Sequence, residues 1–324
     1  MISSIVSPEA IQAATQRIRP YILHTPVEYS PWLSRHCEAE VWLKLEHLQI
    51  TGSFKLRGAA NKLLSLLPAQ RAQGVITAST GNHAAAVAYI ADRLGLPATI
   101  YLPETVAPTK VSQLRYYEVE LRYHGQDAIE AEREARRVAE AAGRPYVSPY
   151  NDAEVIAGQG SIGPELLRQV PTLDTVLVPV GGGGLMGGMA AYLKARRPEV
   201  RVVGCQPRHS AVMYESVQAG RILDLPSLPT WSDGTAGGLE AESLTFPLCQ
   251  QGVDAWELLA EAEIEAGLRF LLETHYFLVE GAAALSVAAL LRAPQRYRGR
   301  RVVLILCGRK LSLSQLATLL APEA

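Results

Sequence analysis

An apolar strand that ends in four consecutive glycines constrains this chain more than any other feature of its sequence. Residues 176–188 read VLVPVGGGGLMGG, so a strand, the glycines and a helix follow one another. Glycines leave backbone N–H groups uncovered and a helix N-terminus adds partial positive charge, which together cradle a phosphate group. A flexible turn is the alternative, but four ordered glycines lose much conformational entropy on folding. We therefore expect a strand–loop–helix unit with a phosphate site.

The same loop permits a second interpretation, because Gly182, Gly184 and Gly187 match the GxGxxG spacing of dinucleotide sites. An NAD-dependent oxidoreductase normally has an acidic residue after the next strand to bind the ribose, whereas RVVGCQ ends in Gln206. A P-loop needs lysine at the position of Met189. The loop therefore suits the single phosphate of a smaller cofactor.

Short apolar runs alternate with helix-like segments along the chain. GVITAS, ATIYLP, TVLVPV and RVVLILC favour strands, whereas AAAVAYIADRLG, DAIEAEREARRVAEAAG and VDAWELLAEAEIEAGLRFLLETH favour helices. This alternation predicts an α/β protein with parallel sheets and helices on both faces. We expect two interleaved lobes with a ligand cleft between them. The large lobe would comprise residues 1–50 with 149–324, and residues 51–148 would form the inserted small lobe.

The composition argues against several classes of partner. The chain has 31 Lys and Arg against 32 Asp and Glu, so its charge gives no reason to expect nucleic acid or an anionic membrane. The most apolar stretch, HYFLVEGAAALSVAALL, is too short to span a bilayer comfortably. Neither CxxC nor HExxH occurs, so we expect no metal site, and the dispersed cysteines favour a reducing, cytoplasmic location. These cysteines are Cys37, Cys205, Cys249 and Cys307.

A second polar loop precedes a helix in ASTGNHAAAVAYIA, residues 78–91. The loop places hydroxyl groups and backbone N–H groups at the helix N-terminus, which suits a carboxylate. Ser, Thr and Asn are also good helix caps, so plain capping explains the loop equally well. Both interpretations stay open at this point. The loop residues are Ser79, Thr80, Gly81, Asn82 and His83.

One lysine has an unusual setting in the stretch TGSFKLRGAANKL, residues 51–63. Lysines are most often solvated surface charges, but Lys55 stands among small and apolar residues, where a partly desolvated amine loses its proton more easily. The chain thus combines an amine with a phosphate cradle and a carboxylate cradle. These three features together indicate pyridoxal 5'-phosphate acting on a small amino-acid substrate.

Four stretches, in this order, carry a resemblance to a known family: TGSFKLRGA, STGNHA, VIAGQGSIGPEL with PVGGGGL, and FLVEGAAALSVAALL. The chain resembles pyridoxal-phosphate enzymes of the tryptophan-synthase-β-like fold (fold type II), especially threonine/serine dehydratases and serine racemase. The resemblance extends over nearly the whole chain, from HTPVEYSPWLS to CGRK. It implies two interleaved three-layer lobes with mostly parallel sheets, and a homodimer or homotetramer.

The resemblance also implies roles for matching residues. Lys55 would form the Schiff base and remove the α-proton, and Thr80 stands where racemases carry a serine acid on the far face. Glu280 would line the cofactor pocket, although a structural cap or ion pair is an equal alternative. Ser79, Thr80, Gly81 and His83 would bind the substrate carboxylate. The other residues implied to bind the cofactor are Phe54, Asn82, Gly181, Gly182, Gly183, Gly184, Leu185, Gly234 and Cys307.

The implied chemistry depends on Cys307, which would face the pyridine nitrogen, and on Asn82, which would hydrogen-bond the ring's 3-oxygen. A neutral thiol stabilises a pyridinium poorly, so loss of a β-leaving group is favoured. We expect dehydration of L-threonine and L-serine to a 2-oxo acid and ammonia. The alternatives are a dehydratase of another β-hydroxy amino acid (3-hydroxyaspartate or phenylserine), an amino-acid racemase, or a catalytically silent cofactor-binding protein.

Two departures from the family pattern affect these expectations. Gln206 and Val212 stand where serine racemase carries acids that bind a divalent cation, so we expect no metal at this place. The family's terminal SGGN is CGRK here, which introduces Arg309 and Lys310. These two cations are candidates for binding an extra anionic group on the substrate.

Overall fold

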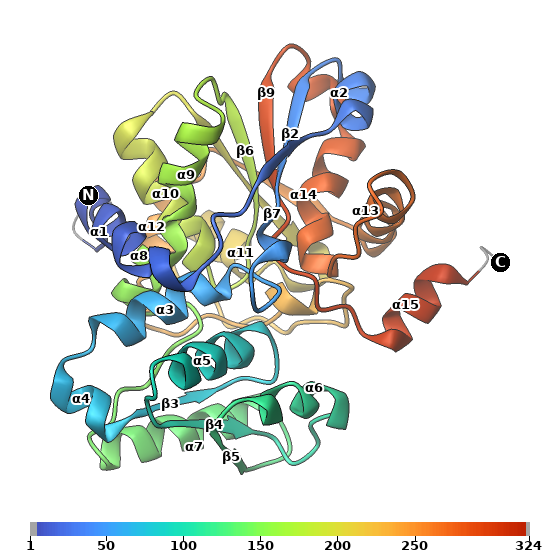
Figure 1. Cartoon of the computed structure of the whole chain (residues 1–324). Coiled ribbons are helices and arrows are strands. Elements are labelled where there is room, and N and C mark those ends of the chain that lie inside the picture. The colour runs from blue at the N-terminus through green and yellow to red at the C-terminus, as the bar shows by residue number, and fades with distance from the viewer. Residues whose placement is uncertain (1–4, 322–324) are drawn as a thin grey trace.

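The computed structural model describes residues 5–321 and arranges their strands in two β-sheets (Figure 1). The strands are β1 Val27–Tyr29, β2 Glu40–Lys44, β3 Val75–Ala78, β4 Ala98–Leu102, β5 Glu120–Tyr123, β6 Thr175–Pro179, β7 Arg201–Pro207, β8 Ala255–Leu259 and β9 Arg301–Ile305. The larger sheet has the order β1-β2-β9-β6-β7-β8, and the smaller sheet has the order β3-β4-β5. Neighbouring strands are parallel except β1 and β2, which are antiparallel.

Helices cover both sheets, as parallel strands require, because each strand-to-strand connection must cross a face of the sheet. The α-helices are α1 Pro8–Ile18, α2 Pro31–Cys37, α3 Lys55–Ser65, α4 Pro68–Gln73, α5 Asn82–Arg93, α6 Pro108–Ser112, α7 Ala128–Ala141, α8 Ala153–Gly160, α9 Ile162–Gln169, α10 Gly184–Arg196, α11 Val212–Ala219, α12 Thr245–Gly252, α13 Glu261–Thr274, α14 Gly281–Arg292 and α15 Leu313–Leu320. The predicted α/β class with mostly parallel sheets is confirmed.

The large sheet forms the centre of the upper part of Figure 1. Strand β6 (TVLVP) is buried at every position, because α14 and α10 both pack on it. Helix α13 packs in turn on α14, and α8 packs on α10. The carboxyl end of β6, where the glycine loop begins, therefore lies between layers of helices, where parallel α/β sheets place their ligands.

The small sheet has α5 and α7 on its opposite faces (Figure 1). Ile100 and Leu102 of β4 pack with alanines of α5, whereas Tyr101, between them in the sequence, packs with alanines of α7. This alternation follows from the two-residue period of a strand. Both faces of the small sheet are thus covered by alanine-rich helices.

The strands of the small sheet lie between residues 75 and 123, and the strands of the large sheet lie on either side of them in the sequence. Helix α3 packs against α5 and also against α8 and α1, so it lies where the two regions meet. The boundaries predicted for the inserted lobe, residues 51 and 148, stay a prediction. Helix α3 is the element that matters most for the site, because it begins at Lys55.

One predicted helix is wrong at its start. The sequence pattern favours a continuous helix over residues 253–275, but residues Ala255–Leu259 (AWELL) form strand β8, parallel to β7 at the edge of the large sheet. The helix begins only at Glu261, after Ala260. Pairing with β7 satisfies the backbone of this short segment, and that pairing is not visible from local periodicity. None of the helices in residues 5–321 is long and apolar enough to cross a membrane.

Candidate active site

The glycine loop connects β6 to α10, as the sequence predicts. Its shape requires glycine, because a Cβ atom on Gly182 would lie 2.5 Å from the ring of Tyr150. A Cβ atom on Gly181 would lie 2.9 Å from the backbone of Thr235, and Gly183 has a φ of +83°. Helix α10 begins at Gly184. The amide N–H groups of the loop and of the first residue of α10 are therefore presented by glycines, which suits a phosphate group.

Lys55 is the first residue of α3, and it follows Phe54, whose ring centroid lies 5.2 Å from Lys55 Nζ. The Nζ atom donates a hydrogen bond to Pro149 O at 2.8 Å. Burial lowers the pKa of the Lys55 amine to about 8, although Cys307 and Glu280 act in the opposite direction. An amine with this pKa has a substantial neutral, nucleophilic fraction near pH 7 to 8.

The loop from Ser79 to His83 connects β3 to α5. The N-cap residue of α5 is Gly81, and no side chain caps this helix. The capping alternative is therefore not realised, and the N-terminus of α5 keeps N–H groups available for an anion. Leu185, in contrast, is the second residue of α10 and is buried. The N-termini of α5 and α10 are thus two separate places where backbone N–H groups are available to an anion.

His83 is buried in the first turn of α5, and its Nε2 atom lies 2.9 Å from Val147 O. Burial and the nearby Lys55 lower the pKa of His83 to about 3, so the imidazole is neutral at physiological pH. Its Nδ1 atom is buried without a hydrogen-bond partner among the described residues. The Thr80 side chain likewise has no hydrogen-bond partner within residues 5–321 and is half-buried.

Glu280 connects the segment from Ser79 to His83 with the segment after β9. It is only 4% exposed, and both carboxylate oxygens accept from Asn82 Nδ2, at 3.1 and 2.8 Å. The backbone N–H of Lys310 donates to Glu280 Oε2 at 3.1 Å, and Cys307 Sγ lies 3.9 Å from Oε1. Glu280 is the N-cap residue of α14, but its side chain makes no capping bond. Of the two predicted roles for Glu280, the structural cap is therefore not observed.

Cys307 is buried beyond the end of β9, and the segment containing Lys55 runs beside it. The backbone N–H of Phe54 donates to Cys307 O at 3.1 Å, and Ser53 pairs with Gly308 in a β-bridge. Burial and the neighbouring Glu280 raise the pKa of the Cys307 thiol well above its ordinary value. Cys307 is therefore a neutral thiol. Gly234, on the 3-10 helix η6 (Asp233–Thr235), would place a Cβ atom 3.4 Å from Glu280 Oε1.

The sequence pattern of the family described as "Pyridoxal-phosphate dependent enzyme" matches residues 18–308. The chain belongs to this family. The L-threonine ammonia-lyase of Thermotoga maritima is 37% identical over 96% of this chain and 77% of its own length. Maize serine racemase has a TM-score of 0.91 at 33% identity, covering 97% of this chain and 96% of that one. Threonine deaminase isoform 2 from Solanum lycopersicum also has a TM-score of 0.91, at 30% identity, with 97% and 92% covered.

The residues of this pyridoxal-phosphate enzyme fit the cofactor of its family. Protein atoms leave no room for a Cβ atom on Gly181, Gly182 or Gly183, so the loop stays bare of side chains, as a phosphate site requires. The desolvated Lys55 amine suits covalent attachment of an aldehyde. Asn82 Oδ1 is buried without a partner among the described residues, while its Nδ2 atom faces Glu280. A carboxylate only accepts hydrogen bonds, so Glu280 sets the orientation of the Asn82 amide. The amine, the amide and the thiol therefore lie around one site.

Sequence reasoning missed two residues that shape the glycine loop of this enzyme. The ring of Tyr150 packs over Gly182, and its hydroxyl accepts from the backbone N–H of Glu240 at 2.9 Å. Thr245 Oγ1 donates to Gly182 O at 2.6 Å. Both residues are distant from the loop in sequence. No local motif marks them, so only a spatial signal could have identified them.

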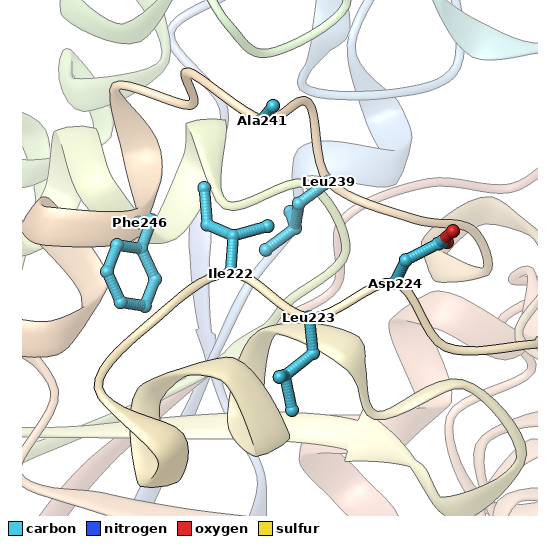
Figure 2. A pocket seen from close by; sticks show the side chains of 6 residues that line it. All are labelled: Ile222, Leu223, Asp224, Leu239, Ala241 and Phe246. Atoms are coloured by element: carbon cyan, nitrogen blue, oxygen red, sulfur yellow. The ribbon is translucent and has the colours of Figure 1, made fainter.

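Other features of the enzyme lie outside this site. A cavity of about 670 Å³ is lined by none of the predicted site residues. Figure 2 shows the side chains that line it. Across the described range 5–321, no three His, Cys, Asp or Glu side chains come together in a way that could hold a metal ion. Gln206 Oε1 accepts from the backbone N–H of Tyr214 at 2.8 Å, so this side chain stabilises α11. The cavity is lined by Ile222, Leu223, Asp224, Leu239, Ala241 and Phe246.

Proposed function

We propose that this enzyme is a lyase that dehydrates and deaminates L-threonine and L-serine to 2-oxo acids and ammonia. The observation that carries the proposal is the position of the Lys55 amine, which is desolvated and close to both Cys307 and Glu280. Relatives named L-threonine ammonia-lyase, at 37% and 39% identity over more than nine-tenths of the chain, support the same reaction class. When bound, the cofactor withdraws electrons from the substrate's α-carbon and so makes the α-proton acidic.

The site residues then have separable tasks in this proposal. Lys55 Nζ takes the α-proton, and its low pKa lets it release that proton again to the departing β-hydroxyl. The loop from Ser79 to His83 binds the α-carboxylate through the N-terminus of α5, and this fixes the orientation of the α-carbon. The hydroxyl leaves as water. The released enamine hydrolyses to the 2-oxo acid and ammonia.

The remaining residues hold the cofactor in the proposal. The four glycines and Leu185 bind its phosphate at the start of α10, and Phe54 packs against its ring. Asn82, oriented by Glu280, hydrogen-bonds the 3-oxygen, while Gly234 leaves room beside the ring. Cys307 keeps its proton because burial raises its pKa, so it offers the pyridine nitrogen a neutral partner. A neutral partner favours elimination over transamination.

Racemisation is the second candidate, and Thr80 is the specific residue that favours it. A racemase needs a proton donor on the face of the substrate opposite Lys55. The hydroxyl of Thr80 lies in the substrate loop and has no partner within residues 5–321. For the protein as a whole we also propose a cytoplasmic location and assembly as a homodimer or homotetramer, which the family resemblance supports.

The first experiment records the visible spectrum of the purified enzyme and measures 2-oxo acid release from L- and D-β-hydroxy amino acids. We expect a yellow protein that releases 2-oxobutyrate from L-threonine and pyruvate from L-serine. Chiral chromatography of the residual amino acid tests the second candidate, because racemisation gives the D-enantiomer without release of ammonia. A colourless protein, or a yellow one that acts on no member of the panel, contradicts the proposed function.

A further inference from the structure

The motif CGRK places two cations after the thiol, and the structure separates their side chains. Arg309 is exposed, and its Nε atom lies 3.1 Å from the position of a Cβ atom on Gly52. Lys310 is half-buried and points to the substrate loop, where its Nζ atom donates to Gly81 O at 3.4 Å. Of the two cations, Lys310 is therefore the one that reaches the proposed binding site of the substrate.

The ammonium of Lys310 has more N–H donors than the protein provides acceptors for them. Within residues 5–321 its one hydrogen bond is the long contact with Gly81 O, and no carboxylate oxygen lies within 4.0 Å of Nζ. Burial lowers the pKa of Lys310 to about 8, while Glu280 raises it and the nearby Lys110 of α6 lowers it. A half-buried ammonium beside a second cation is stabilised when an anion binds between them.

The α-carboxylate of the substrate does not account for this cation. In the proposed function the N-terminus of α5 binds that group, and the resembled family has asparagine of SGGN at the position of Lys310. An additional cation at the same loop therefore indicates an additional anion on the substrate. The ammonium can donate up to three hydrogen bonds, enough to bind a carboxylate and still contact Gly81 O.

We propose that Lys310 is a specificity-determining residue that binds a second carboxylate on the substrate side chain, so that acidic β-hydroxy amino acids such as 3-hydroxyaspartate are preferred over threonine. This inference rests on the proposed function and names the substrate class of the same site. The α C–H and β C–O bonds break, the proton goes to Lys55 and the hydroxyl leaves as water. Hydrolysis of the enamine takes up one water, so 3-hydroxyaspartate gives oxaloacetate and ammonia.

The test compares kcat/KM for L-threo-3-hydroxyaspartate and L-threonine in the wild-type holoenzyme and in Lys310→Gln. We expect the wild-type ratio to favour the acidic substrate. In Lys310→Gln the ratio falls about 10- to 100-fold, the range of one lost charge-assisted hydrogen bond. The loss appears in KM for 3-hydroxyaspartate. Lys310→Arg keeps the positive charge and retains most of the preference.

Arg309→Gln is the matched control, because it removes the neighbouring cation that faces Gly52, and its ratio stays within about twofold of wild type. The proposal is overturned if the wild-type enzyme prefers threonine, or if Lys310→Gln lowers kcat/KM equally for both substrates. Equal lowering assigns Lys310 to the α-carboxylate or to structure. Release of 2-oxobutyrate alone contradicts this inference and leaves the proposed function intact.

A binding measurement decides the matter without turnover. Calorimetric titration of the holoenzyme compares succinate with butyrate, two four-carbon acids that differ by one carboxylate. We expect succinate to bind at least about tenfold tighter, and we expect Lys310→Gln to abolish the difference. Equal binding of the two acids to wild type overturns the proposal, even if the enzyme is inactive on every amino acid tested.

Discussion

Two cations two residues apart on helix α3 have opposite environments. Arg57 is fully buried and donates to Glu46 through Nε at 2.8 Å and to Glu165 through both terminal nitrogens at 2.8 Å. Lys55 has a backbone carbonyl as its hydrogen-bond acceptor and no carboxylate within ion-pair distance among the described residues. Burial alone would lower both pKa values, but Glu46 and Glu165 hold the pKa of Arg57 above its ordinary value.

The partners of Arg57 belong to a closed ionic cluster. Lys44 Nζ lies 2.6 Å from Glu165 Oε2 and 3.9 Å from Glu46 Oε1, so two positive charges face two negative ones. Thr25 and Ser161 complete the hydrogen bonds of the cluster. The cluster joins β2, α3, α9 and the 3-10 helix η3 (Glu46–Leu48). Because its two positive and two negative charges balance, the cluster anchors α3. The anchored helix holds Lys55 where no carboxylate of the described residues pairs with its amine.

Removing Lys55, which has no ion-pair partner among the described residues, is the strongest test of the comparison with Arg57. In Lys55→Ala we expect turnover to fall by about 10⁴-fold or more and the visible absorbance of the bound cofactor to disappear. The unfolding midpoint, compared between the two cofactor-free proteins, should change little, because no ion pair is lost. Steady-state assays, absorbance and thermal unfolding measure these three quantities. Retained turnover in this variant contradicts the central assignment.

Removing Arg57, which is paired with two carboxylates, should lower stability rather than remove the reacting amine. Arg57→Met leaves Glu46 and Glu165 buried with too few partners, and we expect the free energy of unfolding to fall by about 3 to 5 kcal/mol. Denaturant titration measures it. The control is Lys62→Met on the same helix, whose pair with Asp152 is partly exposed and 2.5 Å long, and it should cost about 1 kcal/mol or less. Equal losses of unfolding free energy in the two variants would show that the buried pairs of Arg57 stabilise the fold no more than the partly exposed pair of Lys62.

A change in the cofactor's hydrogen bonds sharpens the description of the open site. In Asn82→Ala the amide held by Glu280 is lost, and we expect kcat to fall about 10- to 100-fold. Cofactor retention should weaken less, since the glycine loop and Lys55 remain. Dialysis followed by absorbance separates retention from rate. Unchanged kinetics would mean that Asn82 does not contact the reacting group.

The pKa of Lys55 leads to a test of its open environment by pH. Burial lowers this pKa to about 8, so the neutral amine increases about tenfold per pH unit below 8 and becomes constant above it. We expect the rate at which the apoenzyme attaches pyridoxal phosphate to follow this curve, measured by the visible absorbance. A rate that still rises tenfold per unit between pH 8.5 and 10 would indicate an ordinary, solvated lysine.

The smallest expected effect concerns a divalent cation. Gln206 and Val212 replace the acids of the racemase-type site, and Gln206 Oε1 is already used by the backbone of Tyr214. We expect EDTA to change activity by less than about twofold. A collapse of activity that magnesium restores would contradict this prediction.

Local motifs are the source of most residues of the candidate site. The glycine loop, the loop before α5 and Lys55 are recognisable because each combines a strand end, small residues and a helix start within a dozen residues. Contacts between segments that are distant in the sequence were not predicted. Tyr150 and Thr245 shape the glycine loop from distant segments, and β8 is a strand because β7 pairs with it. The separation of Arg309 from Lys310 was equally invisible, since the two are adjacent in sequence.

The sequence by itself determined the α/β class and the two loops that precede helix N-termini, and it singled out Lys55, because these features depend on residue type and local spacing. Only the tertiary structure decided that Lys55 has no carboxylate partner among the described residues whereas Arg57 is paired with two. The reason is physical: Glu46 and Glu165, which neutralise Arg57, come from other elements, as do Glu280 and Cys307 beside Lys55. Whether a buried charge is paired depends on which distant groups are packed within a few ångströms of it.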